Sequence, residues 1–292
     1  MRARAVLVLT AATAAVALPV PASACACGVA PQARIALERA LVVHDGRRED
    51  LVISYDLRAA GARPAVVLPV PSEPAVTAVK DDPFAWLERV TARPVATAGG
   101  DDEGAAGAAP RTTIRRSTVG GYSVTRLHGG GGRVLDRWLR RNGYALPAGA
   151  APILERYVRR GWWFVALRLA KRQDGALKPL RLRFASARPV YPMRLAQLAT
   201  QPVNLDLYAV AGEQLEAEPL ARTFSRPLTE LPEAAPASLR LPAGATLTKL
   251  EAVAMAPTAF RDDVWLEGVA QGRVVAFDES VWAQLVTLVA RL

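Results

Sequence analysis

The first regular pattern of hydrophobic and polar positions along the chain is typical of a β-hairpin. Apolar and β-branched residues fill 40–44 and 51–55, which predicts two strands. Between them lies the dipeptide Asp45-Gly46, whose residues favour the tight turn that joins antiparallel strands. Residues 65–68 form a third short apolar run, which predicts another strand.

Three further segments have the pattern of helices. Asp82 and Pro83 begin the first, which is predicted to reach about Val90, because Asp caps a helix and Pro suits its first turn. The second and third, at 134–141 and 153–159, follow each other closely in the middle of the chain. We expect these two helices to form a central helical pair.

Most of the remaining regular segments have the pattern of strands. Residues 180–184 alternate between apolar and basic side chains with a period of two, as a half-buried strand does. The sequence therefore predicts an α+β fold that is rich in strands, with a largely antiparallel sheet and the central helical pair. The other strands predicted in this part of the chain are 122–127, 162–169, 203–210 and 215–218.

Composition divides the chain into three parts. Residues 1–24 form a leader, and 25–220 form an α+β domain that contains an Ala- and Gly-rich loop at 96–109. The last part, 221–292, begins with a proline-rich linker at 226–242 and continues with short strands and an apolar end. No apolar run in the sequence reaches the roughly 18–20 residues that a membrane-spanning helix needs.

The leader has the three parts of a secretory signal peptide. Arg2 and Arg4 supply its positive charge, residues 5–18 are apolar, and prolines follow. The small side chains of residues 22–24 suit the signal peptidase, which predicts cleavage after Ala24. An uncleaved N-terminal anchor is the alternative. We therefore expect an exported protein that is periplasmic, secreted or at the cell surface.

The two cysteines of the chain, Cys25 and Cys27, come directly after the expected cleavage site. Cys25 is a candidate for lipid attachment, because lipoprotein processing needs a cysteine at that position. A Cys25–Cys27 disulfide is a second interpretation, although so short a ring is strained. A redox or metal-binding pair is a third, although C-x-C is not the usual oxidoreductase motif. Contact with a membrane is therefore expected to be peripheral or through a lipid anchor.

The formal net charge of +10 comes mainly from arginine. Only four of the 37 basic residues are lysines, and alanine is abundant, which is typical of a GC-rich coding sequence. The basic residues occur as small pairs spread along the chain, whereas a phosphate-binding surface clusters its charge. We therefore expect no nucleic-acid partner, and only weak attraction to anionic polymers of the envelope.

Patterns that would carry catalysis are incomplete. His128 with the following glycines 129–131 resembles the oxyanion-hole loop of esterases, but the chain has no G-x-S-x-G motif. The remaining enzymatic hypothesis is hydrolysis by two carboxylates roughly 5–9.5 Å apart. Glu88, Asp136 and Glu155 are candidates, and no spacing selects a pair. We therefore assign no catalytic residue, no metal ligand and no cofactor.

Aromatic residues concentrate in the middle of the chain and include the adjacent Trp162 and Trp163. Exposed rings of this kind bind sugars or a partner surface, whereas rings at these spacings are more often in the core. Successive strand residues face opposite ways, so one ring is expected to face the core. The other ring is then covered by a helix, covered by a partner, or left exposed. Trp162 and Trp163 are therefore candidate binding residues.

A series of short motifs occurs in a fixed order between residues 25 and 220. They are Cys27-Gly28, 38–41, 67–72, 84–88, 135–139, 142–144, Tyr157-Val158, 161–169, 179–182 and 190–195. In this order they resemble domain-of-unknown-function family 2330, whose members are exported bacterial proteins. The sequence departs from the family in having its cysteines only two apart, and in ending with a segment, 281–292, that is too short for a membrane helix. The resemblance implies a location and an architecture, and it implies no chemistry.

Taken together, these features favour an uncharacterised cell-envelope protein that binds a partner or has a structural role. The expected partner is a cell-wall polymer or another envelope protein. The alternative is an envelope hydrolase that acts on a polysaccharide or another polymer with a carboxylate pair. An apolar cleft with two close acids would favour the hydrolase, and an exposed aromatic patch would favour the binding protein.

Overall fold

The computed structural model describes most of the chain between residues 33 and 269, together with 23–24 and 29–30. The described part leaves out 60–64, 93–113, residue 145, 171–172 and residue 174. Several expectations fall outside it: the leader up to residue 22, Cys25 and Cys27, the loop at 96–109 and the apolar end at 281–292. Those expectations stay predictions.

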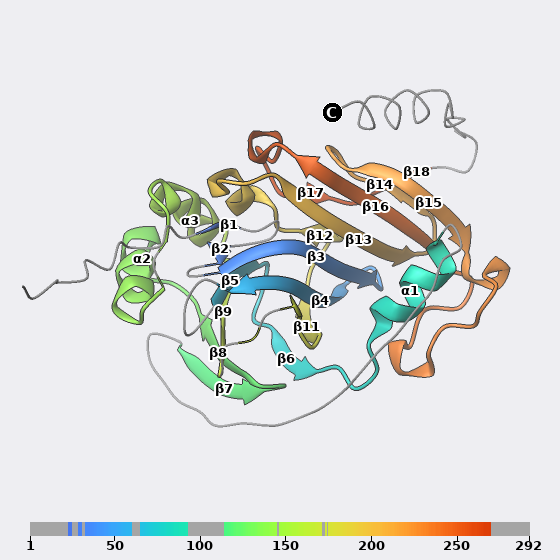
Figure 1. Cartoon of the computed structure of the whole chain (residues 1–292), viewed down its shortest axis with the longest axis horizontal. Coiled ribbons are helices and arrows are strands. Elements are labelled where there is room, and N and C mark those ends of the chain that lie inside the picture. Colours follow the sequence, from blue (N-terminus) through green and yellow to red (C-terminus); the bar gives the residue numbers. More distant parts are fainter. Residues whose placement is uncertain are drawn as a thin grey trace, which may run out of the picture.

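Two large sheets form the centre of the molecule (Figure 1). The eight-stranded sheet has the order β15-β16-β13-β3-β4-β11-β6, with β10 also paired to β4. Its strands are β3 (Ala33–His44), β4 (Arg48–Ala59), β6 (Ala75–Ala78), β10 (Gly175–Ala176), β11 (Leu180–Ala185), β13 (Val203–Ala211), β15 (Ala221–Pro227) and β16 (Thr246–Met255).

The six-stranded sheet has the order β1-β2-β5-β9-β8-β7. Its strands are β1 (Ser23–Ala24), β2 (Val29–Ala30), β5 (Ala65–Val70), β7 (Arg115–Val119), β8 (Tyr122–Leu127) and β9 (Trp163–Leu169). Two small pairs complete the strands, β12 (Val190–Tyr191) with β17 (Val264–Trp265), and β14 (Gln214–Glu216) with β18 (Glu267–Val269).

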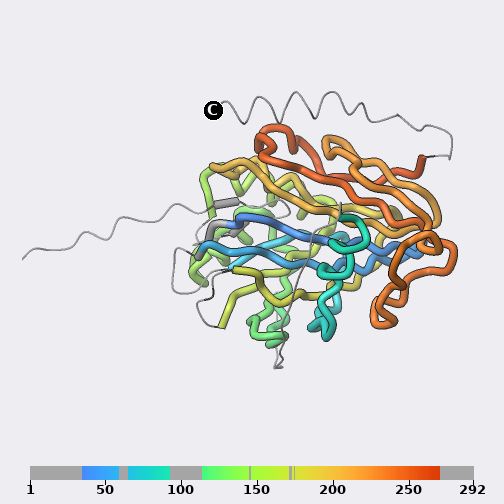
Figure 2. Tube along the Cα trace, turned by 45° about the vertical axis from the view of Figure 1, so that its right-hand side comes forward, coloured from blue at the N-terminus to red at the C-terminus, as the bar shows by residue number. Residues whose placement is uncertain are grey.

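The hydrophobic positions place these sheets and the helices in four layers. One core cluster lies between the sheets, where residues such as Val42 and Ile53 from the eight-stranded sheet meet Val66 and Val165 from the six-stranded sheet. A second cluster joins the outer face of the six-stranded sheet to helices α2 (Gly132–Arg141) and α3 (Ala150–Arg159). In a third, helix α1 (Pro83–Thr91) covers the outer face of the eight-stranded sheet (Figure 2).

Short 3-10 helices fill the connections between these elements. They are η1 (Arg194–Leu198), η2 (Leu228–Glu230), η3 (Ala237–Leu239) and η4 (Pro257–Ala259). The stretch 226–242, expected to be a linker, contributes Leu228, Leu231, Leu239 and Leu241 to the cluster under α1. The division of the chain at residue 220 stays a prediction, while strands from both sides of it share the eight-stranded sheet.

The predicted strand-rich, largely antiparallel architecture is confirmed, with one parallel pair between β3 and β13. The expected hairpin is present, and its last cross-strand pair is His44 with Glu49. The central helical pair is corrected. Helices α2 and α3 do contact each other, but they lie at one end of the molecule because they cover only the six-stranded sheet (Figure 1). A third helix, α1, lies on the other sheet.

Candidate functional site

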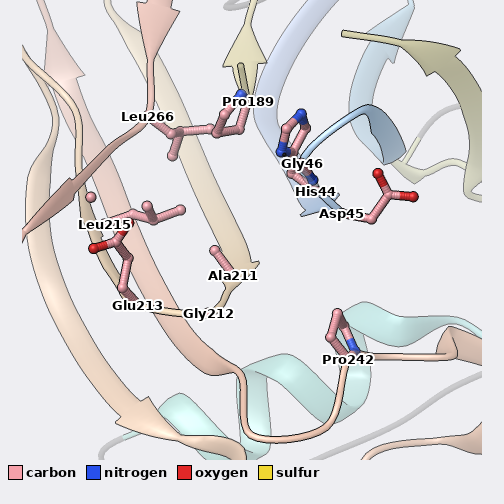
Figure 3. Close-up of a pocket in the computed structure, with 11 residues that line it drawn as sticks. His44, Asp45, Gly46, Pro189, Ala211, Gly212, Glu213, Leu215, Pro242 and Leu266 are labelled. Atoms are coloured by element: carbon pink, nitrogen blue, oxygen red, sulfur yellow. Dashed lines mark hydrogen bonds between the residues drawn. The ribbon is translucent and has the colours of Figure 1, made fainter. Parts of the chain in front are cut away.

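A cleft of about 450 Å³ opens at the end of the eight-stranded sheet where the β3–β4 turn faces the β13–β14 turn (Figure 3). Its walls come from segments that are far apart in the sequence and meet only because β3 and β13 lie side by side. The lining residues are His44, Asp45, Gly46, Pro189, Ala211, Gly212, Glu213, Leu215, Pro242, Leu266 and Gly268.

The imidazole of His44 has both of its nitrogens occupied. Nδ1 accepts a hydrogen bond from the backbone N–H of Gly46 at 3.1 Å. The proton must then be on Nε2, which donates to the carbonyl oxygen of Ser186 at 3.0 Å. This ring ties the hairpin to the segment that leads into β12, and it has no free nitrogen with which to take a proton from a substrate.

The two carboxylates of the cleft do not converge. Asp45 accepts hydrogen bonds from the N–H groups of Arg47 and Arg48, at 2.9 and 2.7 Å, and these bonds hold its pKa below the usual value. Glu213 is exposed, and its carboxylate lies against Gly268. A Cβ at position 268 would collide with that carboxylate. Figure 3 shows the two carboxylates on opposite sides of the cleft. They therefore do not form the acid pair that hydrolysis of a glycosidic bond needs.

The remaining surface of the cleft is apolar or backbone. Pro189, Leu215, Pro242 and Leu266 supply most of it, and the glycines expose main chain. No Phe, Tyr or Trp is among the residues that line this cleft, and the ring of His44 is held by its two hydrogen bonds. Stacking on a sugar ring is therefore not available here, whereas apolar side chains and main-chain groups suit a peptide segment.

A buried acid supports one wall of the cleft from inside. Glu49, the cross-strand partner of His44, is fully buried, and its Oε2 accepts a hydrogen bond from Val190 N–H at 2.9 Å. Burial raises the pKa of Glu49 well above its usual value. Its Oε1 has no hydrogen-bond partner among the described residues. Together, Glu49 and His44 hold the segment that contains Pro189.

The acids proposed from the sequence are not brought together into one site. Glu88 on α1 forms an ion pair with Arg39 at 2.9 Å. Asp136 on α2 pairs with Arg140 one turn later, also at 2.9 Å. Glu155 on α3 accepts a hydrogen bond from the first N–H of α2, at Gly132. Each carboxylate therefore has a local structural partner.

The two candidate tryptophans contact different core clusters. Trp162 is 5% exposed and packs with Tyr157 beneath the helices. Trp163 is half-buried, packs against the cluster between the sheets, and stacks on His128 with ring centroids 4.8 Å apart. The expectation that adjacent rings face opposite ways is met: Trp162 is buried beneath the helices, and Trp163 is covered in part by the sheets and His128. Neither ring lines the cleft.

The glycines after His128 serve a turn before α2. Gly129, Gly130 and Gly131 all have positive φ, between 76° and 82°, which L side chains adopt with strain. His128 is occupied by its stacking on Trp163. The resemblance to an esterase loop therefore has a conformational explanation.

Sequence reasoning missed the cleft as a site. Only Asp45-Gly46 gave a signal, as a turn, while Glu213, Pro189 and Leu266 lie in unremarkable stretches of sequence. Among the described residues, no group of three His, Cys, Asp or Glu side chains is placed to hold a metal ion. Within that same part of the chain, no helix has the length and apolar character to cross a membrane.

Comparison with known proteins gives a family and two distant structures. The family described as "Uncharacterized protein conserved in bacteria (DUF2330)" matches residues 21–230. No curated protein matches the chain. The crystal structure of baculovirus P35 has a TM-score of 0.39 and 9% identity, covering 82% of this chain and 98% of P35. A mutated baculovirus P35 after caspase cleavage has a TM-score of 0.32 and 11% identity, covering 80% and 99%. TM-scores this low give no basis for transferring a property.

Proposed function

We propose that this chain, which belongs to the DUF2330 family of uncharacterised proteins conserved in bacteria, is an exported envelope protein that binds a partner and performs no catalysis. The proposal of export rests on the leader at 1–24, with its basic start, apolar stretch and Ala-Ser-Ala site. The proposal of binding rests on the cleft.

One observation carries the binding role: His44 and Asp45 are engaged in holding the walls of the cleft, and the exposed Glu213 lies on the opposite side from Asp45 (Figure 3). His44 bonds to Gly46 and Ser186, and Asp45 bonds to the turn that follows it. A general acid–base pair needs two groups that both reach the substrate, and the two carboxylates of this cleft do not converge. These walls instead form a rigid recess with apolar and main-chain surface, which supports recognition of a ligand.

The partner that fits this recess best is a peptide segment of another envelope protein. Leu215, Leu266 and the two prolines offer contacts to apolar side chains, and the β13–β14 turn exposes main chain at Gly212. A cell-wall polysaccharide is less well suited, because recognition of sugars commonly uses the face of an aromatic ring and no Phe, Tyr or Trp lines this cleft. The carboxylate-pair hydrolase gains no support from the site.

A blocked cleft tests the binding role. Ala211→Phe places a ring in the recess, and Ala75→Phe makes the same change on the exposed edge strand β6 as a control. Peptides of about ten residues, selected by phage display on the wild-type chain, are expected to lose at least tenfold in affinity with Ala211→Phe and to keep it with Ala75→Phe. Peptide binding that is insensitive to Ala211→Phe, or turnover of an envelope polymer by the purified chain, would refute the proposal.

Export has a separate test. The natural chain, produced in bacteria, is expected in the extracytoplasmic fraction with a mass that begins at Cys25. A full-length chain that retains Met1 and stays in the cytosol would show that the leader has another role. Acyl mass on the processed chain would identify a lipoprotein, and a loss of two hydrogens would identify a disulfide.

A further inference from the structure

Helices α2 and α3 lie at one end of the molecule (Figure 1), and their exposed residues include many arginines. On α2, four arginines repeat at helical spacing on the face opposite the buried Leu135 and Leu139. They are Arg133, Arg137, Arg140 and Arg141. Helix α3 and its C-cap add Arg156, Arg159 and Arg160, and all seven side chains belong to exposed residues. The fold thus gathers charges that are dispersed along the sequence.

Most of this charge is not neutralised within the described part of the chain. Arg140 is paired with Asp136, and Arg160 is paired with the buried Asp263. The other acid of the two helices, Glu155, is bonded to the backbone of α2. The remaining five arginines of the group have no carboxylate partner among the described residues: Arg133, Arg137, Arg141, Arg156 and Arg159. A surface of this kind attracts anions.

Apolar side chains lie at the flank of the arginine face. Val134 is 44% exposed and is the one strongly exposed large hydrophobic side chain on the described helices. Trp138, one turn further along α2, is half-buried, and the guanidinium of Arg116 from β7 lies 5.9 Å above its ring. Arginine together with exposed valine and an amphipathic ring is the composition of a membrane-interface surface.

Strands β1 and β2, on either side of the expected cleavage site, lie at this same end (Figure 1). Strand β2 contacts η1, and η1 in turn contacts α3. Four residues separate Val29 at the start of β2 from Cys25, a distance of at most about 14 Å along an extended chain. Cleavage after Ala24, as proposed above, would therefore leave the candidate lipid-attachment residue within that distance of β2, which lies at the end of the molecule that holds α2 and α3 (Figure 1).

We infer that the arginine face of α2 and α3 is a docking surface for an anionic phospholipid bilayer. In this arrangement, the guanidinium groups contact lipid phosphates while Val134 enters the interface. The cleft is built from the β3–β4 and β13–β14 turns, so the surface is distinct from it. The inference does not depend on peptide binding in the cleft, and either one can fail without the other.

Vesicle binding by the full chain tests this inference. Large vesicles of phosphatidylcholine with 30% phosphatidylglycerol would be compared with pure phosphatidylcholine in a sedimentation assay. Each arginine near an anionic surface changes partitioning about fivefold, so Arg137→Ser with Arg141→Ser should reduce it about 30-fold. The control variant, Arg47→Ser with Arg226→Ser, removes the same charge from exposed positions in the β3–β4 turn and on β15. It should change partitioning to the anionic vesicles less than threefold.

A third variant, Val134→Ser, distinguishes binding to a membrane from binding to a soluble polyanion. Val134→Ser should reduce partitioning to the anionic vesicles roughly threefold, because part of an apolar side chain no longer enters the interface. It should leave binding to soluble polyphosphate unchanged. Equal losses for the two arginine double variants would overturn the inference, as would failure to bind the anionic vesicles. Polyphosphate binding without vesicle binding would overturn it in favour of a soluble polymer.

Discussion

The contact between α2 and α3 depends on one missing side chain, that of Gly132. A Cβ at this position would lie 2.6 Å from the nitrogen of Glu155 and 2.7 Å from the carbonyl oxygen of Ala151. Both are backbone atoms of α3, so no rotation of a side chain relieves the collision. We therefore predict that Gly132→Ala forces the two helices apart by roughly 0.8 Å, the shift that restores ordinary van der Waals distances.

The size of the effect follows from three contributions. Overpacking of a close contact costs about 1–3 kcal/mol, and weakening the hydrogen bond from Gly132 N–H to Glu155 costs about 1 kcal/mol more. The higher helix propensity of alanine offsets less than about 1 kcal/mol, because Gly132 is only the first residue of α2. The net loss is about 2–3 kcal/mol, which lowers the Tm of a chain of this size by roughly 5–10 °C.

Thermal unfolding followed by circular dichroism measures this loss. Gly212→Ala is the matched control, because a Cβ there meets nothing within 4 Å and the residue does not have a positive φ. The control is expected to melt within about 2 °C of the wild type. If Gly132→Ala melts together with the control, the close approach of the two helices is not a constraint on stability and the reasoning from backbone contact is refuted.

Two further predictions concern buried acids. The pKa of Glu49 is raised in the folded protein, whereas a Glu side chain in the unfolded chain has a pKa of about 4.3. The stability that Glu49 contributes is therefore complete below about pH 4.3 and is lost as pH rises toward the folded pKa. Glu49→Gln should therefore become progressively more stable relative to the wild type between pH 4.5 and 7.5 in urea titrations, and a pH-independent difference would contradict the raised pKa of Glu49. Asp263 accepts from Tyr157 and pairs with Arg160 and with Arg194, which is itself buried. Asp263→Ala should cost about 3 kcal/mol, because the buried hydroxyl of Tyr157 loses its acceptor and Arg194 keeps only the exposed Asp262 as a carboxylate partner. Glu267→Ala removes an exposed ion pair with Arg188 and should cost less than about 1 kcal/mol, so equal urea midpoints for the two variants would count against this network.

Local chemistry made parts of the fold predictable from the sequence. The β3–β4 hairpin follows from Asp45-Gly46, since the Asp side chain satisfies the N–H groups of the turn and Gly46 adopts a φ of 91°. Helix α1 begins where Asp82 and Pro83 indicate, and the Asp82 side chain accepts from Phe84 N–H at 2.8 Å. In both cases, the interacting groups lie within three residues, so the sequence contains the whole interaction.

The candidate site could not be predicted in the same way. The cleft requires the parallel pairing of β3 with β13, in which Glu38 lies opposite Leu205, far away in the chain. The apolar pattern of a strand predicts that the strand is buried, but it does not select which other strand lies beside it. The pattern therefore identified His44 as part of a hairpin and gave no indication that Glu213 and Leu266 would face it.

The sequence by itself determined the three α-helices, the β3–β4 hairpin and several other strands, and the motif order by which the chain resembles its family. It also determined that Trp162 and Trp163 point in opposite directions, because side chains alternate along an extended chain. Only the tertiary structure decided that helices cover one ring while the core between the sheets takes the other. It likewise brought dispersed arginine pairs together on α2 and α3. Contacts between distant segments depend on how all apolar faces are buried at once, and no local pattern records that solution.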